Sequence, residues 1–196
     1  MTIGHRRSHP SPRVARGFTL IELMVTVAIT VVLLVLVARS FTEFREKAIV
    51  RGAAGDLMAL VAQAKLEAAK RNDFVTVSVR GSGSAWCIGL QKGITGCDCT
   101  STTLCDISQL STGSFNGAKL DAAANFGGSP ATDFSIDPRV GMLRNLSGGG
   151  SVLLRSPSDR WDYRVQFNLT ATAQTNLCAP TGGSAGKHKL SDYPSC

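Results

Sequence analysis

The sequence contains few of the residues that catalysis and phosphate binding usually require. Only three of its 196 residues are histidines. His5 and His9 lie in the basic N-terminal stretch, and His188 has no evident partner acid or nucleophile. The glycines fall in turns, and none forms a phosphate-binding loop after a predicted strand. These absences indicate a protein that is not an enzyme and that holds no cofactor.

Acidic residues are missing from the N-terminal stretch, because none precedes Phe18. The basic residues of that stretch are four arginines: Arg6, Arg7, Arg13 and Arg16. The formal net charge of +7 falls to +3 without residues 1–17, where 17 Lys and Arg face 14 Asp and Glu. A basic stretch before an apolar segment is typical of a cytoplasmic flank. The positive charge of the chain is therefore weak support for nucleic-acid binding.

Charged residues and helix breakers are nearly absent from the next segment. Between positions 18 and 129 there is no proline, and from Phe18 to Ala38 the polar residues are Thr19, Glu22, Thr26 and Thr30. As a helix, this segment measures about 31 Å, which is enough to cross a bilayer. No A-x-A-like cleavage site follows it, unlike in an ordinary secretory signal. The segment predicts a membrane-length helix, and the simplest alternative is a single-pass anchor or signal peptide.

Glu22 is the unusual residue of this segment. A carboxylate at the centre of a membrane costs about 2.5–3.5 kcal/mol on insertion scales, and less near the interface. A simple anchor has no need of such an acid. The acid is understandable if it meets a cation once the helix leaves the lipid. A new N-terminal amine on another copy would be such a cation, if the chain is cut before Phe18.

The stretch "GFTLIELMVTVAI" at residues 17–29 resembles the N-terminal signal of type IV pilins and type II secretion pseudopilins. The resemblance implies that prepilin peptidase cleaves after Gly17 and methylates Phe18. It also implies that Glu22 is the residue required for assembly. Residues 1–17 would then be a leader, and residues 18–39 a transmembrane and assembly helix. The family often has a proline just after this apolar segment, where this chain reads "ARSF" at 38–41.

The helix is predicted to continue to about Arg71, with residues 40–72 as its amphipathic half. One apolar stripe recurs at helical spacing, formed by Leu57, Leu60, Val61, Ala64 and Ala68. Residues 51–72, followed by "FVTVSV" at 74–79, resemble minor pilins and pseudopilins of the GspH/FimT type. "WCIGL" at 86–90 and "CDC" at 97–99 fit the same group.

Residues 73–196 are predicted to form a β-rich head. In "WDYRVQFNLTAT" apolar and polar residues alternate, which predicts a strand with one buried face. The turn "SGGG" at 147–150 predicts a hairpin between residues 131–145 and 151–156, and residues 110–130 are expected to form a loop. The expected fold class is α+β: a pilin fold, in which a long N-terminal helix packs on an antiparallel sheet.

All six cysteines lie beyond the apolar segment, at Cys87, Cys97, Cys99, Cys105, Cys178 and Cys196. The C-x₂-C spacing of zinc sites is absent, and an even count in an exported domain favours disulfides. We therefore expect disulfides and no metal. The first four cysteines allow three pairings, which the sequence leaves open. Cys178 is expected to pair with Cys196 and to close the tail into a loop.

That loop contains "GKHK", residues 186–189. Its position and charge are similar to the G-R-x-R motif of DNA-binding FimT-type minor pilins. Lys187 and Lys189 can neutralise phosphates but lack the fork of arginine. Arg155, Arg160 and Arg164 could widen a basic patch, but Asp159 and Asp162 interleave with them. The alternative is that this segment binds nothing and is simply a solvated basic tail, whose positive charge Asp192 partly offsets.

The resemblance favours a structural subunit: a minor pilin that primes or joins a type IV pilus. The alternatives are a minor pseudopilin of type II secretion and a DNA-binding minor pilin for transformation. The expected partners are other pilins or pseudopilins, prepilin peptidase and the inner membrane, with double-stranded DNA as the partner in the third alternative. Before assembly the chain would cross the inner membrane once, with its head in the periplasm. After assembly it would be part of a pilus or pseudopilus.

Overall fold

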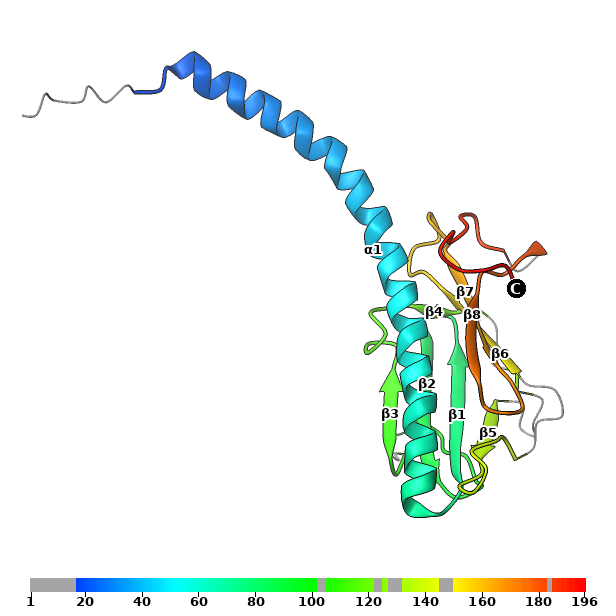
Figure 1. Ribbon diagram of the computed structural model, residues 1–196. Helices are drawn as coiled ribbons and strands as arrows, with labels where there is room; N and C mark the ends of the chain where they lie inside the picture. The colour runs from blue at the N-terminus through cyan, green and yellow to red at the C-terminus, as the bar shows by residue number, and fades with distance from the viewer. Residues whose placement is uncertain (1–16, 102–104, 122–124, 127–131, 145–149, 183–184) are drawn as a thin grey trace, which may run out of the picture. The chain divides into compact units, whose positions relative to one another are not determined.

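The computed structural model describes residues 17–101, 105–121, 125–126, 132–144, 150–182 and 185–196, with the side chains of 37–39 excepted. The chain divides into two units, Met1–Phe41 and Thr42–Cys196, which are described separately. One helix, α1, runs from Leu20 to Arg71 and belongs to both (Figure 1). The predicted continuous helix is therefore confirmed.

Local chemistry explains where α1 ends. Lys70 and Arg71 lie in its last turn, where cations interact favourably with the helix dipole. Asn72 follows with a φ of 49°, a left-handed conformation that asparagine tolerates better than most residues. The amide of Asp73 donates to the carbonyl of Ala68 at 3.3 Å, which satisfies one of the last free carbonyls.

The head contains two four-stranded antiparallel sheets. The first has the strand order β3-β2-β1-β5, and the second has the order β4-β6-β7-β8. The first sheet consists of β1 (Val75–Ser82), β2 (Ala85–Lys92), β3 (Ser108–Ser111) and β5 (Asp133–Ile136). The second consists of β4 (Lys119–Leu120), β6 (Gly150–Arg155), β7 (Arg164–Leu169) and β8 (Thr175–Cys178). The head thus has the α+β layout expected of a pilin.

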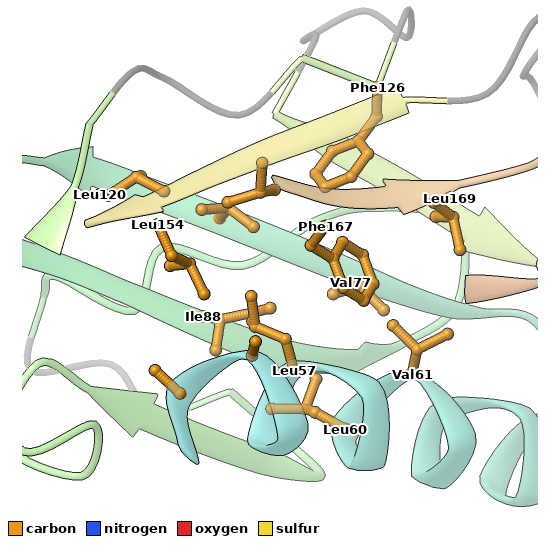
Figure 2. Packing of buried hydrophobic residues seen from close by; sticks show 14 of the residues in the cluster. Leu57, Leu60, Val61, Val77, Ile88, Leu120, Phe126, Leu154, Phe167 and Leu169 are labelled. Atoms are coloured by element: carbon orange, nitrogen blue, oxygen red, sulfur yellow. The ribbon is translucent and has the colours of Figure 1, made fainter. Parts of the chain in front are cut away.

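The hydrophobic core lies between the head half of α1 and the two sheets. All five residues of the predicted helix stripe are at most 3% exposed. Leu57, Leu60 and Val61 point toward side chains of both sheets, including Ile88 and Phe167 (Figure 2). Along β7, Val165, Phe167 and Leu169 are buried and alternate with half-exposed residues, as predicted. The helix and both sheets therefore share one core.

The predicted hairpin across residues 147–150 is wrong. β5 pairs with β1, with Val75 opposite Ile136, whereas β6 pairs with β7 in the other sheet. A glycine-rich turn indicates that the chain reverses, but cross-strand contacts select the partner strand. Ile136 is fully buried in the core, and the register with β1 places it there. Residues 145–149 of the expected turn lie outside the described residues.

Residues 110–130 are more ordered than the predicted loop. They include the end of β3 and all of β4. Phe115 and Phe126 are each 1% exposed, and the ring of Phe115 stacks on Trp86 with centroids 4.5 Å apart. The segment is rich in small residues, so its composition predicted a loop and gave no sign that these two phenylalanines are buried. Residues 122–124 and 127–130 of this segment lie outside the described residues.

Candidate functional site

The start of α1 places three of the predicted site residues close in sequence. Gly17 and Phe18 precede the helix, and Thr19 occupies its N-cap position. The amide of Glu22 donates to the Thr19 hydroxyl oxygen at 3.3 Å. The spacing Thr-x-x-Glu is that of a capping box, and an acid in the first turn interacts favourably with the helix dipole. This hydrogen bond was not predicted, although the four-residue pattern in the sequence indicates a helix N-terminus.

The apolar segment of α1 offers a long surface. Every residue from Gly17 to Leu36 is exposed in this single chain. Within this segment Thr26 and Thr30 donate their hydroxyl protons back to helix carbonyls at 2.9 and 2.7 Å. Their polarity is thereby satisfied inside the helix. The segment is long and apolar enough to cross a membrane, and the same surface could pack against other helices.

The head half of α1 begins with a polar cluster that the sequence did not reveal. The hydroxyl of Tyr163 on the second-sheet side donates to Glu43 at 2.7 Å, and Lys47 pairs with the same carboxylate at 2.7 Å. One turn on, Glu46 accepts a hydrogen bond from the amide of Ser158 at 3.0 Å. These bonds fasten the first turns of the head helix to the segment before β7.

The same contacts shift the pKa values of the groups that make them. The hydrogen bonds from Lys47 and Tyr163 lower the pKa of Glu43. Burial, and then the hydrogen bond to Glu43, raise the pKa of Tyr163. Glu43 therefore stays charged and Tyr163 stays neutral near neutral pH. The contacts of Glu43 and Lys47 thus hold the first turns of the head helix in place.

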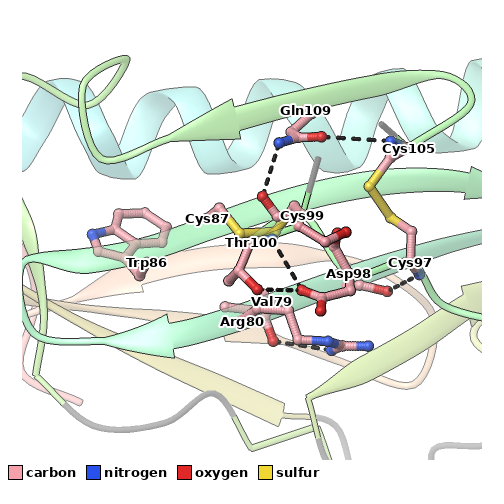
Figure 3. The surroundings of a disulfide bond; sticks show 12 residues. Val79, Arg80, Trp86, Cys87, Cys97, Asp98, Cys99, Thr100, Cys105 and Gln109 are labelled. Atoms are coloured by element: carbon pink, nitrogen blue, oxygen red, sulfur yellow. Dashed lines mark hydrogen bonds between the residues drawn. A yellow bond between two sulfur atoms is a disulfide. The ribbon is translucent and has the colours of Figure 1, made fainter. Parts of the chain in front are cut away.

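Four cysteines form two interlocked disulfides on the outer face of the first sheet. Cys87 is bonded to Cys99, and Cys97 to Cys105. Gln109 lies between the two bonds, donating to the carbonyl of Cys99 at 2.8 Å (Figure 3). This pairing was left open by the sequence. Each bond is expected to stabilise the head by about 2–4 kcal/mol.

Gly89 makes this arrangement possible. A Cβ atom at this position of β2 would collide with the sulfurs of Cys97 and Cys105. The opposite side of the first sheet faces the core, so the disulfides cover the face of β1 that carries polar side chains. There the hydroxyl of Ser78 accepts from the amide of Cys97 at 3.0 Å. With their sulfurs bonded to each other, these cysteines are not available as metal ligands.

The C-terminal loop is closed by a third disulfide, between Cys178 and Cys196. Lys187 and Lys189 are both exposed in this loop. Each has a partner: Lys187 donates to the carbonyl of Asp159 at 2.7 Å, and Lys189 to the hydroxyl of Ser195 at 3.0 Å. Their charges nevertheless remain uncompensated by these neutral acceptors.

The expected widening of a basic patch by Arg155 and Arg164 is not supported. Arg164 forms ion pairs with Asp121 and Asp162 at 2.9 and 3.0 Å, and Arg155 lies 3.4 Å from Asp159. Burial alone would raise the pKa of Asp162, but the hydrogen bonds and charge of Arg164 lower it. Alternating acids along the sequence therefore neutralise these arginines inside a shared network. Arg160 instead lies over the Trp161 ring, with 5.7 Å to the centroid.

His188 has a packing role in the same loop. Its ring lies 5.5 Å from the Trp161 ring and 5.5 Å from the Tyr163 ring, measured between centroids. A cavity of about 250 Å³ lies behind it, lined by Arg164, Pro180, Leu190 and their neighbours. Arg164 is already ion-paired at this cavity.

Comparison with protein families gives two matches. The family model described as type II transport protein GspH matches residues 53–171, more than half of the chain. The model of the prokaryotic N-terminal methylation motif matches residues 12–38, which include Gly17, Phe18 and Glu22. Searches of curated proteins and of solved structures returned no match.

Proposed function

Because the chain belongs to the GspH family and carries the N-terminal methylation motif, we propose that it is processed and then built into a fibre as a minor subunit. Membership makes it a pilin or pseudopilin, a class of structural proteins that assemble with other pilins and are processed by prepilin peptidase. The observation that carries the proposal is the unbroken helix from Leu20 to Arg71, apolar and exposed at one end and packed in the head at the other.

In the proposed cycle, prepilin peptidase cleaves after Gly17 and methylates the new amine of Phe18. The apolar segment of α1 first anchors the chain in the inner membrane, with the head in the periplasm. In the fibre, the Glu22 carboxylate pairs with the Phe18 amine of a neighbouring subunit. That pairing would offset the cost of a buried charge, because opposite charges compensate each other where water is excluded. The three disulfides fit an oxidising compartment.

The proposed fibre is a type IV pilus, which the chain would join near the tip and prime. The second candidate is the pseudopilus of type II secretion, which the description of the matching family favours. Mechanical shearing of intact cells separates the two. A subunit of a surface pilus should be recovered with the sheared fibres. A pseudopilin should stay with the cell envelope, and protein secretion should fall when its gene is deleted.

Double-stranded DNA is a further proposed partner, and the exposed Lys187 and Lys189 are the residues that support it. Replacing both with alanine should weaken binding of the purified protein to a labelled duplex. Since each lysine would contact one phosphate, the slope of log affinity against log salt should fall by about two. Fluorescence anisotropy over a salt series measures both quantities.

The matched control for this experiment replaces Lys70 and Lys92, which are also exposed, and removes the same charge. DNA affinity that is equal in the wild type and the Lys187/Lys189 variant would refute a DNA site in this loop. An equal loss of DNA affinity in the Lys70/Lys92 control would also refute such a site, because it would show that the loss follows from the lower net charge alone.

A further inference from the structure

The C-terminal loop contacts the first turns of the head half of α1. Asp192 forms an ion pair with Arg51 of the helix. The ring of His188 lies against Tyr163, whose hydroxyl donates to Glu43 at 2.7 Å. The loop thus reaches both ends of the stretch Glu43–Arg51, directly at one end and through Tyr163 at the other. In Figure 1 the red C-terminal segment lies near this part of α1.

Besides the disulfide, backbone hydrogen bonds and a few side-chain contacts hold the end of this loop. Ser195 forms an isolated bridge with Ala179 and accepts from Lys189 at 3.0 Å, and the partly buried Tyr193 packs against the core. The amide of Ala179 donates to the carbonyl of Pro194 at 2.7 Å, and the amide of Cys196 to the carbonyl of Ala179 at 3.0 Å. Leu190 is buried in the core, but Ser191 and Asp192 are exposed. A chain terminus frays unless it is tied down. The bond between Cys178 and Cys196 supplies that tie.

The three disulfides differ in how easily a thiol can reach them. Cys196 is exposed, although its partner Cys178 is only 6% exposed. In the other two bonds Cys97 is half-buried, and Cys87, Cys99 and Cys105 are at most 7% exposed, so neither bond has a fully exposed cysteine. Thiol–disulfide exchange requires a thiolate to approach a sulfur atom, so its rate depends on this access. A mild reductant should therefore open the C-terminal disulfide before it opens the two disulfides beside β2.

We propose that the Cys178–Cys196 bond is a redox-sensitive latch that fixes the stretch Glu43–Arg51 of α1 to the head. When the latch opens, Asp192 and His188 leave their partners and this stretch loosens, while both sheets stay folded. The latch opens when the dithiol of a thiol oxidoreductase reduces the bond: the dithiol gives two electrons and two protons to the two cysteine sulfurs and becomes a disulfide. The latch closes by the reverse exchange, with the disulfide of a thiol oxidoreductase as the oxidant. The two cysteine thiols give up two protons and two electrons and form one disulfide, and the disulfide of the oxidoreductase becomes a dithiol. This inference does not depend on which fibre the chain joins.

Hydrogen exchange of the full-length protein in detergent micelles tests the latch. Dithiothreitol is added in steps, and alkylation followed by mass spectrometry identifies which cysteines are reduced. When only Cys178 and Cys196 are reduced, exchange of amides 46–51 should rise about ten-fold, because the local opening of this stretch becomes easier. Exchange in β1 and β2 should stay unchanged.

Two variants make the test specific. Cys178→Ser combined with Cys196→Ser should reproduce the rise without reductant. Asp192→Asn keeps the disulfide and removes only the direct ion pair, so it should give a smaller rise in the same peptides. If the double serine variant does not fold, the dithiothreitol series alone decides. Unchanged exchange at residues 46–51 after selective reduction would overturn the proposal, and so would an equal rise across β1 and β2.

Discussion

Replacing Glu22 with alanine is expected to leave the chain in the membrane and to lower its incorporation into fibres by about 100-fold or more. Removing one partner of a buried ion pair costs about 3–5 kcal/mol, and each 1.4 kcal/mol is about ten-fold in an equilibrium. The neighbouring Phe18 amine would be left buried without its counter-charge. Membrane insertion should not suffer, since an apolar residue replaces an acid. Quantitative immunoblots of membrane and fibre fractions measure both effects.

The structure supplies a sharper control than the alanine variant. The amide of Glu22 donates to the Thr19 hydroxyl at 3.3 Å, and glutamine is as suitable as glutamate at this position of a capping box. Glu22→Gln therefore removes the charge and keeps the cap, whereas Thr19→Ala removes the cap and keeps the charge. If charge pairing drives assembly, the glutamine variant should fail and the Thr19 variant should be incorporated. The reverse pattern would show that Glu22 acts as a helix-capping residue.

Replacing Leu57 with alanine should destabilise the head by about 2–5 kcal/mol, the usual cost of such a truncation in a packed core. Leu57 is 2% exposed and lies between α1 and the two sheets (Figure 2). For a chain of this size, the midpoint of thermal unfolding should fall by about 5–15 °C. Circular dichroism of the full-length protein in detergent follows the transition of the head.

Leu66 offers a matched control on the same helix. It is 71% exposed, so Leu66→Ala removes the same atoms without opening a cavity. Its effect on stability should stay within about 0.5 kcal/mol. Similar losses for the two variants would mean that the head half of α1 does not pack on the sheets through its predicted stripe.

The helix could be predicted from the sequence, whereas the pairing of the strands could not. The apolar residues from Leu57 to Ala68 lie on one face of one helix, so their spacing in the sequence is enough to predict that helix. The partner of β5 is β1, more than 50 residues earlier in the chain. Which strands pair depends on how distant residues share a core. A local turn signal between β5 and β6 therefore gave the wrong partner.

In the candidate site too, features set by neighbouring residues could be predicted, and features set by distant residues could not. The motif from Gly17 to Glu22 can be read directly, because its residues are adjacent in the chain. The pairing of Cys87 with Cys99 could not be deduced, since all three pairings of four nearby cysteines fit the spacing. The contact of Tyr163 with Glu43 spans 120 residues and had no signal in the sequence. The ion pairs of Arg155 and Arg164 required the fold to bring Asp121 beside them.

The N-terminal residue and intact mass of the purified mature protein test the central claim most directly. The account predicts a chain that begins at Phe18, with one methyl group on its amine and three disulfides in the unreduced sample. Such a chain has the new cation that a carboxylate at position 22 requires. Protein recovered with residues 1–17 still attached, from cells with active prepilin peptidase, would contradict the account.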